Sequence, residues 1–153
     1  MTNLTKNFTK EELLYSATGT SMGIINMIPD TLIPNLQRTA EWLQELRNIL
    51  GEKRDVETPI KVLSCFRSER LNKAVGGAKA SDHMKALAAD IQVDGMTPLQ
   101  LAQFIKKSMP FDKLINEFNQ WVHVSIPATD EPKSKLMTAV KEKGTTVYKP
   151  GLF

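Results

Sequence analysis

The sequence has few of the features that mark a secreted or membrane-embedded protein. It contains one cysteine, Cys65, which excludes an internal disulfide and gives no sign of an oxidising compartment. No run of about 18 apolar residues is present, so no membrane-spanning segment is expected. The first six residues lack the apolar core of a signal peptide, and we therefore expect a product that is cytoplasmic when made.

The charge balance is also modest. The 153 residues include 20 basic and 17 acidic side chains, for a formal charge of +3, and no cluster of Lys and Arg stands out. This argues against a nucleic-acid partner and only weakly favours an anionic polymer such as bacterial cell wall. The length fits one domain spanning residues 1–153, which we expect to be a monomer.

Hydrophobic periodicity predicts an α+β fold. One helix is expected to start near Phe8. Others are expected at residues 34–50, where Gly51 should end the helix, and at 70–75, 97–107 and, in the polar tail, 134–143. Buried strands are expected at 60–66 and 87–93, and a hairpin at 113–117 and 121–126. Early helices and late strands favour a small antiparallel sheet with helices packed on one side.

The two histidines of the chain both lie in unusual settings. His83 occupies a polar segment just before the apolar strand that contains Asp90, and a carboxylate in a buried strand is costly unless it is paired or binds a metal. On one continuous helix these two side chains would be roughly 10 Å apart along the axis. Ligands of one zinc ion must lie within about 2.2 Å of it, so we predict a chain reversal at Lys85-Ala86. Without a metal, Asp90 would be a salt-bridged or hydrogen-bonded residue.

The second histidine, His123, lies in an alternating strand. Val122, Val124 and Ile126 form one face of that strand, which belongs to the core, while Trp121, His123 and Ser125 form the other. His123 is therefore expected to point toward a cleft or solvent.

The position of Glu117 depends on the length of the hairpin loop. A two-residue turn would place Glu117 on the valine face, whereas a three-residue turn at residues 118–120 would pair it with Trp121, on the face of His123. Asparagine tolerates the left-handed conformation that three-residue turns require. We therefore predict the longer turn, with Asn119 or Gln120 at positive φ.

These residues together predict a catalytic metal site. Two imidazoles and one carboxylate leave one position of a tetrahedral zinc ion open for water, whereas structural zinc sites favour closed sets rich in cysteine. Glu117 is the candidate base that accepts the proton of this water. Arg67 is a candidate for binding a substrate carboxylate, and its alternative is an ion pair with Glu69 or Asp82. Cys65 is expected to be a buried core residue rather than a nucleophile.

Several segments resemble a known family. The segments Ser81–Asp90 (SDHMKALAAD) and Trp121–His123 (WVH), with the lead-in Ser64–Ser68 (SCFRS) and Leu71–Gly77 (LNKAVGG), resemble the zinc D-alanyl-D-alanine carboxypeptidase and L-alanyl-D-glutamate endopeptidase family. That family includes phage endolysins and shares its fold with the Hedgehog signalling domain. The resemblance runs from about Phe8 to the end of the chain.

The resemblance implies specific roles for particular residues. His83, Asp90 and His123 match the zinc ligands, Glu117 matches the catalytic glutamate that some members place six residues before the last ligand, and Arg67 and Ser81 match substrate-contacting positions. Other members have an acid three residues before that histidine, where this chain has Gln120. Ala86 and Cys65 stand where relatives usually have glycine, and alanine at positive φ would cost about 1 kcal/mol.

The functional prediction is therefore a zinc metallopeptidase that hydrolyses an amide bond in peptidoglycan stem peptides. Without a signal peptide, it would reach the cell wall after a phage-type release, as a lysis enzyme does. The alternative is a catalytically silent cell-wall-binding or virion module that retained the zinc site. A purely structural metal site is disfavoured because no fourth protein ligand is evident.

Overall fold

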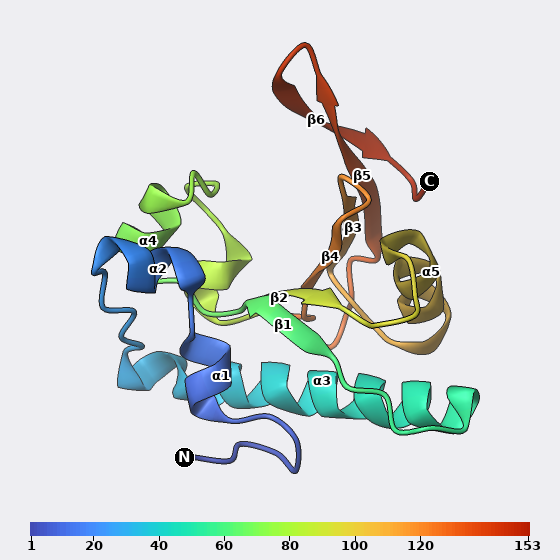
Figure 1. Ribbon diagram of the computed structural model, residues 1–153, viewed down its shortest axis with the longest axis horizontal. Coiled ribbons are helices and arrows are strands. Elements are labelled where there is room, and N and C mark those ends of the chain that lie inside the picture. The colour runs from blue at the N-terminus through green and yellow to red at the C-terminus, as the bar shows by residue number, and fades with distance from the viewer.

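A six-stranded sheet organises the chain in the computed structural model, which describes residues 1–153 (Figure 1). Its strand order is β1-β2-β4-β3-β5-β6, and only β3 and β5 pair in parallel. The strands are β1 (Lys61–Ser64), β2 (Ala88–Gln92), β3 (Lys113–Glu117), β4 (Trp121–Ser125), β5 (Lys135–Glu142) and β6 (Thr145–Pro150). The predicted α+β class with a small, mostly antiparallel sheet is confirmed.

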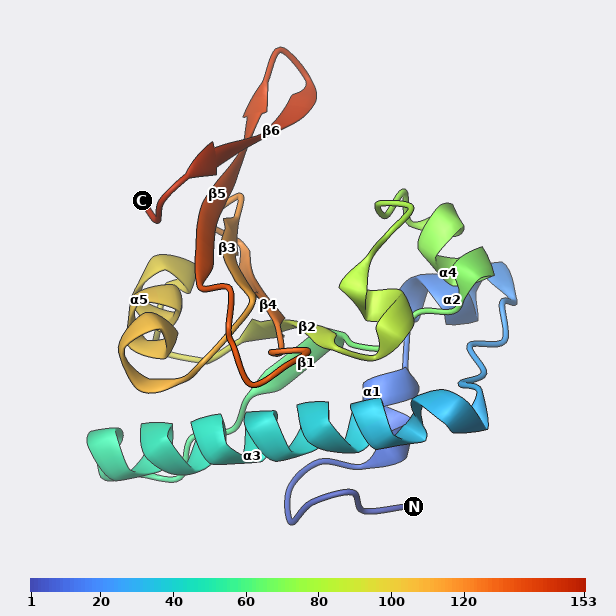
Figure 2. The same cartoon turned by 180° about the vertical axis from the view of Figure 1, so that it is seen from behind.

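Two longer helices cover one face of the sheet. Helix α3 (Ile33–Arg54) runs beneath the strands and α5 (Pro98–Ser108) lies beside β3 and β4 (Figure 2). Their buried leucines share one core with the valine face of β4. The shorter helices α1 (Lys10–Leu14), α2 (Ala17–Met22) and α4 (Glu69–Ala74) gather beyond β1. No helix combines the length and the apolar character that crossing a membrane requires.

Helix α3 does not end at Gly51 as predicted. It continues to Arg54 and ends where Asp55 adopts a left-handed conformation, at φ 54°. A glycine inside a helix lowers its stability by only about 1 kcal/mol relative to alanine. Burial of the leucine side chains of α3, of which Leu50 is the last, stabilises the helix by more than this amount. Gly51 therefore lowers the stability of helix α3 slightly but does not end it.

The polar tail forms a β-hairpin, and the helix predicted for residues 134–143 is wrong. The segment pairs with β3 from Lys113↔Lys135 to Glu117↔Ala139 and turns back into β6 through Lys143 and Gly144, both at positive φ. The helix-forming side chains of this segment are overruled by hydrogen bonds to the edge of β3, because strand formation depends on tertiary partners more than on local preference.

One carboxylate fixes the crossover between β4 and β5. Asp112, which is buried, accepts hydrogen bonds from the backbone N–H groups of Ala128 at 3.1 Å and Lys133 at 3.0 Å. These two groups lie near opposite ends of the connecting loop. Asp112 thereby sets the position from which the β5–β6 hairpin starts.

Candidate metal centre

A sharp reversal carries His83 toward the sheet. The short 3-10 helix η2 (Asp82–Lys85) begins at Ser81, whose hydroxyl accepts the His83 N–H at 3.2 Å, and ends at Ala86 with φ 58°. The predicted reversal at Lys85-Ala86 is confirmed. Ala86 also adopts the positive φ that costs alanine about 1 kcal/mol. The hydroxyl of Thr39 donates to the Ala86 carbonyl at 2.7 Å and supports the turn.

Strand register brings the other two candidate ligands together. Asp90 of β2 pairs directly with His123 of β4, so both side chains leave the same face of the sheet. Asp90 Oδ1 lies 3.1 Å from His123 Nδ1 and 3.3 Å from His83 Nε2. The potential ligand atoms of all three residues lie within 4.8 Å of one another. The structure therefore brings the three predicted metal-binding residues to a common point.

The ring of His83 is oriented by a backbone carbonyl. Nδ1 lies 2.6 Å from the carbonyl oxygen of Cys65, and since a carbonyl only accepts, Nδ1 carries the proton. Nε2 then carries a lone pair that faces Asp90, and this nitrogen is buried without a hydrogen-bond partner. Cys65 itself is buried, and burial raises the pKa of its thiol to about 12, in accord with a core residue rather than a nucleophile.

The ring of His123 is oriented by a relay of side chains. Ser125 Oγ donates to Asp82 Oδ2 at 2.8 Å, so it must accept from His123 Nε2 at 2.9 Å. The remaining ring nitrogen, Nδ1, then directs a lone pair at Asp90. Strand alternation had placed Ser125 on the face of His123, but nothing in the sequence indicated the contact with Asp82.

Three potential ligand atoms thus converge on one point. Burial alone would raise the pKa of Asp90, but the charge of protonated His83 and His123 and the hydrogen bonds that these rings then donate outweigh it, and they hold the pKa well below its ordinary value. A metal ion that replaces those protons would therefore meet an ionised carboxylate. Two imidazole lone pairs and one carboxylate oxygen form a donor set typical of zinc. The residues present therefore fit a zinc ion, with His83, Asp90 and His123 as its ligands.

Arg67 binds the far side of this site. Its guanidinium donates to Asp90 Oδ2 at 3.2 Å, and two further N–H groups bond to Ser64 and Asn72 at 3.1 Å each. The expected alternative, an ion pair with Glu69 or Asp82, is therefore wrong. Of its five N–H groups, about two remain for other partners. Arg67 thus orients Asp90 and still lines the cleft described below.

The hairpin turn places Glu117 on the face of His123. Glu117 pairs with Trp121 across a three-residue turn, and Asn119 has φ 55°, so both predictions for this turn are confirmed. Phe118 also has a positive φ, of 57°, which the sequence did not indicate. Its ring packs edge-on against Trp121, with centroids 5.8 Å apart. Only 9% of Glu117 is exposed, and burial raises the pKa of its carboxyl above the ordinary 4.5.

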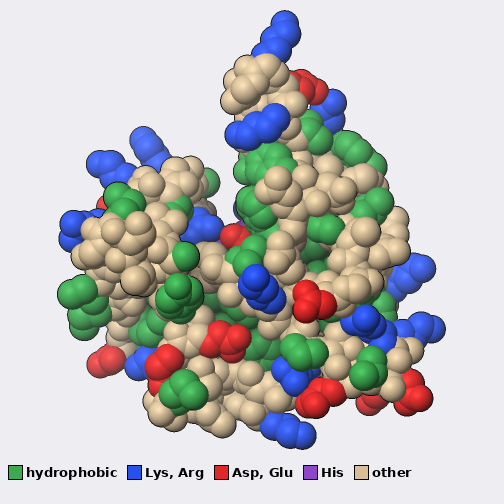
Figure 3. Space-filling view, viewed as in Figure 1, with side chains coloured by type: hydrophobic (Ala, Val, Ile, Leu, Met, Phe, Trp, Pro, Cys, Tyr) green, Lys and Arg blue, Asp and Glu red, His purple; other side chains and the backbone are tan.

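All of these side chains line one cleft. Its volume is about 700 Å³, and it contains the three candidate ligands, Glu117, Arg67 and Ser81. Figure 3 shows the surface hollowed between the β5–β6 hairpin and the lobe that contains α2 and α4. The half-buried Ser81 caps η2 with its hydroxyl, so its predicted contact with substrate remains a prediction.

The relay behind His123 leads to a testable expectation. Replacing Ser125 by alanine removes the group that fixes the ring tautomer, and such losses typically weaken metal binding by about 10- to 100-fold. Zinc titration by calorimetry should show this weakening, while a control variant, Ser108→Ala at the end of α5, should bind zinc as the wild type does. Equal affinities for both variants would contradict the role of the relay.

Comparison with known proteins supports an assignment to a family. No curated protein matches the chain significantly. A family model described as peptidase M15 matches residues 6–125, which include the η2 reversal, both ligand-bearing strands and the hairpin with Glu117. This match covers well over half of the sequence, and the chain belongs to the peptidase M15 family.

Proposed function

We propose that the chain is a zinc-dependent peptidase that hydrolyses an amide bond in peptidoglycan stem peptides. The observation that carries the proposal is the convergence of His83, Asp90 and His123 in a cleft that also contains Glu117. Family membership supports a peptidase, and the resemblance to cell-wall carboxypeptidases and endopeptidases supports the substrate class.

The metal would supply chemistry that the side chains lack. His83, Asp90 and His123 would hold a zinc ion, which would supply a Lewis acid to polarise the scissile carbonyl and to lower the pKa of a water molecule. Glu117 accepts the proton of the attacking water and delivers it to the leaving nitrogen as the C–N bond breaks. The products are a carboxylic acid and an amine, so one water molecule is consumed for each bond cut.

The raised pKa of Glu117 suits this role. Burial brings the proton affinity of the carboxylate closer to that of the groups with which it exchanges protons. Arg67 holds Asp90 in place through one N–H group and offers its remaining N–H groups to a substrate carboxylate at the cleft wall. The binding of substrate by Arg67 and Ser81 is part of the proposal.

Mass spectrometry of muropeptides tests the function directly. The zinc-loaded protein is incubated with purified muropeptides, and new fragments that differ from their precursors by one hydrolysed amide bond are expected. A chelator should stop their formation and added zinc should restore it. Muropeptides that remain intact under every metal condition would contradict the proposed function. The masses of the fragments also identify which bond is cut.

A further inference from the structure

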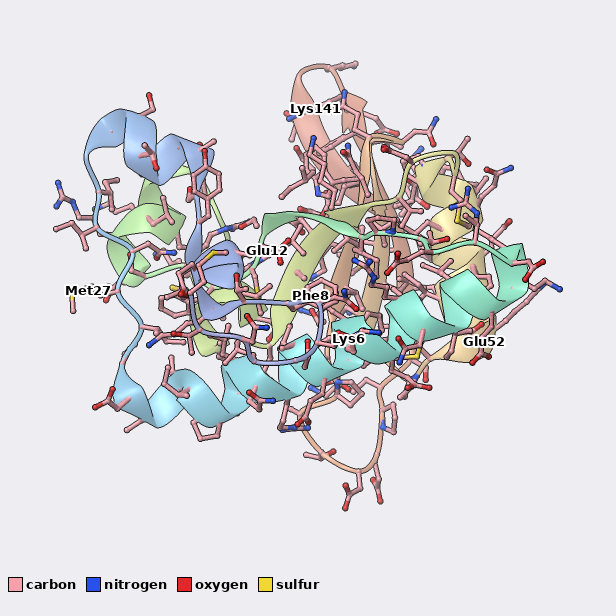
Figure 4. All side chains as sticks on the ribbon, turned by 60° about the horizontal axis from the view of Figure 1, so that its bottom comes forward. Lys6, Phe8, Glu12, Met27, Glu52 and Lys141 are labelled. Carbon is pink, nitrogen blue, oxygen red and sulfur yellow. The ribbon has the colours of Figure 1, made fainter.

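The β5–β6 hairpin forms one wall of the cleft. It contributes Met137, Lys141, Thr146 and Tyr148 to the lining, opposite the segment that leads into η2. Figure 4 labels Lys141 on this hairpin, where its ammonium group lies 5.3 Å from the centre of the Phe118 ring. The hairpin follows residue 125, where the match to the family model ends. The match to the family model therefore does not cover the hairpin or the residues that it contributes to the cleft.

A cross-strand row connects this wall to Glu117. Glu117 of β3 pairs with Ala139 of β5, and Ala139 pairs with Tyr148 of β6. Residues in register on neighbouring strands project from the same face of a sheet. The strands are about 4.8 Å apart, so the Cα atoms of Glu117 and Tyr148 are separated by about 10 Å. Tyrosine and glutamate side chains that lean toward each other can span this distance.

Ala139, between these two residues in the row, has a small side chain that lets them approach each other. It is fully buried, and its single methyl group is the only side chain between Glu117 and Tyr148 in this row. A larger residue there would separate the phenol of Tyr148 from the carboxylate of Glu117. Because Ala139 is fully buried, its neighbours cover it, and Glu117 and Tyr148 both line the cleft in which a substrate peptide can lie.

The electrostatic surroundings of Tyr148 are those of the reaction centre. Partial burial raises the pKa of its phenol, and the carboxylates of Glu117 and Asp90 raise it further. The hydroxyl is therefore protonated, and available as a hydrogen-bond donor, at neutral pH. Tyr148 remains 53% exposed, so its phenol is accessible from the cleft.

We propose that Tyr148 is a further catalytic residue, which donates a hydrogen bond to the carbonyl oxygen of the scissile amide. Negative charge develops on this oxygen as water attacks, so a hydrogen bond donated to it stabilises the transition state more than the bound substrate. The inference rests on the proposed function, because it assigns Tyr148 to the same cleft and the same reaction. No bond to Tyr148 is made or broken, and its proton stays on the hydroxyl.

The test is Tyr148→Phe in the full zinc-loaded chain. With the synthetic pentapeptide L-Ala-D-Glu-L-Lys-D-Ala-D-Ala as probe, kcat should fall by about 10- to 100-fold while KM changes by less than about twofold. The chain has one other tyrosine, Tyr15, which is 59% exposed and lies outside the cleft. Tyr15→Phe is the matched control and should behave as the wild type does. Zinc content and melting temperature should be the same for all three proteins.

A binding measurement separates transition-state stabilisation from a structural effect. In a Glu117→Gln background, which prevents turnover, Tyr148→Phe should weaken binding of a phosphinate analogue of the peptide by about tenfold. Binding of the peptide itself should be unchanged. An unaltered kcat, or a rise in KM alone, would overturn the role of Tyr148 while leaving the proposed function intact. A wild-type protein that cleaves neither the pentapeptide nor muropeptides would overturn both.

Discussion

Replacing Glu117 by glutamine is expected to lower kcat by about 10²- to 10⁴-fold, the usual contribution of a general base. Glutamine has nearly the same shape but cannot accept a proton from water, and the metal ligands are untouched. Initial rates on muropeptides, measured together with zinc content, check this expectation. Glu131→Gln, in the exposed turn before β5, is the control and should retain full activity. Unchanged turnover by Glu117→Gln would show that another group is the base.

The same variant should report on the buried carboxyl when the metal is removed. The pKa of Glu117 in the folded protein lies above the ordinary 4.5, so the metal-free protein loses stability as rising pH ionises this group. Glutamine cannot ionise and escapes that loss. The melting temperature of Glu117→Gln minus that of the wild type should therefore be larger at about pH 7 than at about pH 4. A difference that shrinks with rising pH would contradict the burial of this carboxylate.

Asp90→Asn should remove most of the zinc affinity. The substitution keeps the size of the side chain but replaces a carboxylate oxygen by a weaker neutral ligand, and it leaves Arg67 without its ionic partner. Loss of a direct ligand should exceed the 10- to 100-fold cost of losing an outer contact, so we expect binding to weaken by more than about 100-fold. Activity at limiting zinc should fall in parallel.

A neighbouring aspartate provides the control for this experiment. Asp94 lies on the exposed turn after β2 and outside the cleft, so Asp94→Asn should bind zinc normally. Calorimetric titration of metal-free protein measures both affinities. Wild-type affinity in Asp90→Asn would exclude this residue as a ligand.

The sequence was sufficient to predict most of the candidate site because short-range rules govern it. Strand alternation placed His123 opposite the valine face, and the separation of His83 from Asp90 required the reversal that ends at Ala86. Asparagine at position 119 indicated the turn that orients Glu117. Each of these inferences depends on residues fewer than ten positions apart.

Long-range contacts could not be predicted in the same way. The tail was expected to form a helix because its local composition favours one, and only the unpaired edge of β3 converts it into a strand. The partner of Arg67 is 23 residues away, and the contact between Asp82 and Ser125 spans 43 residues. Such contacts depend on the order and register of the strands in the folded sheet, and local patterns in a single sequence do not predict these.

The parallel pairing of β5 with β3 also affects local motion. With β4 on one side and β5 on the other, the strand that ends at Glu117 has hydrogen-bonded neighbours along both edges, and the free edge of the sheet is displaced to β6. Amide hydrogens of β3 can exchange with solvent only when one of these neighbours detaches. On this side of the sheet, fraying is therefore expected to begin at β6, two strands away from the backbone that carries the candidate base.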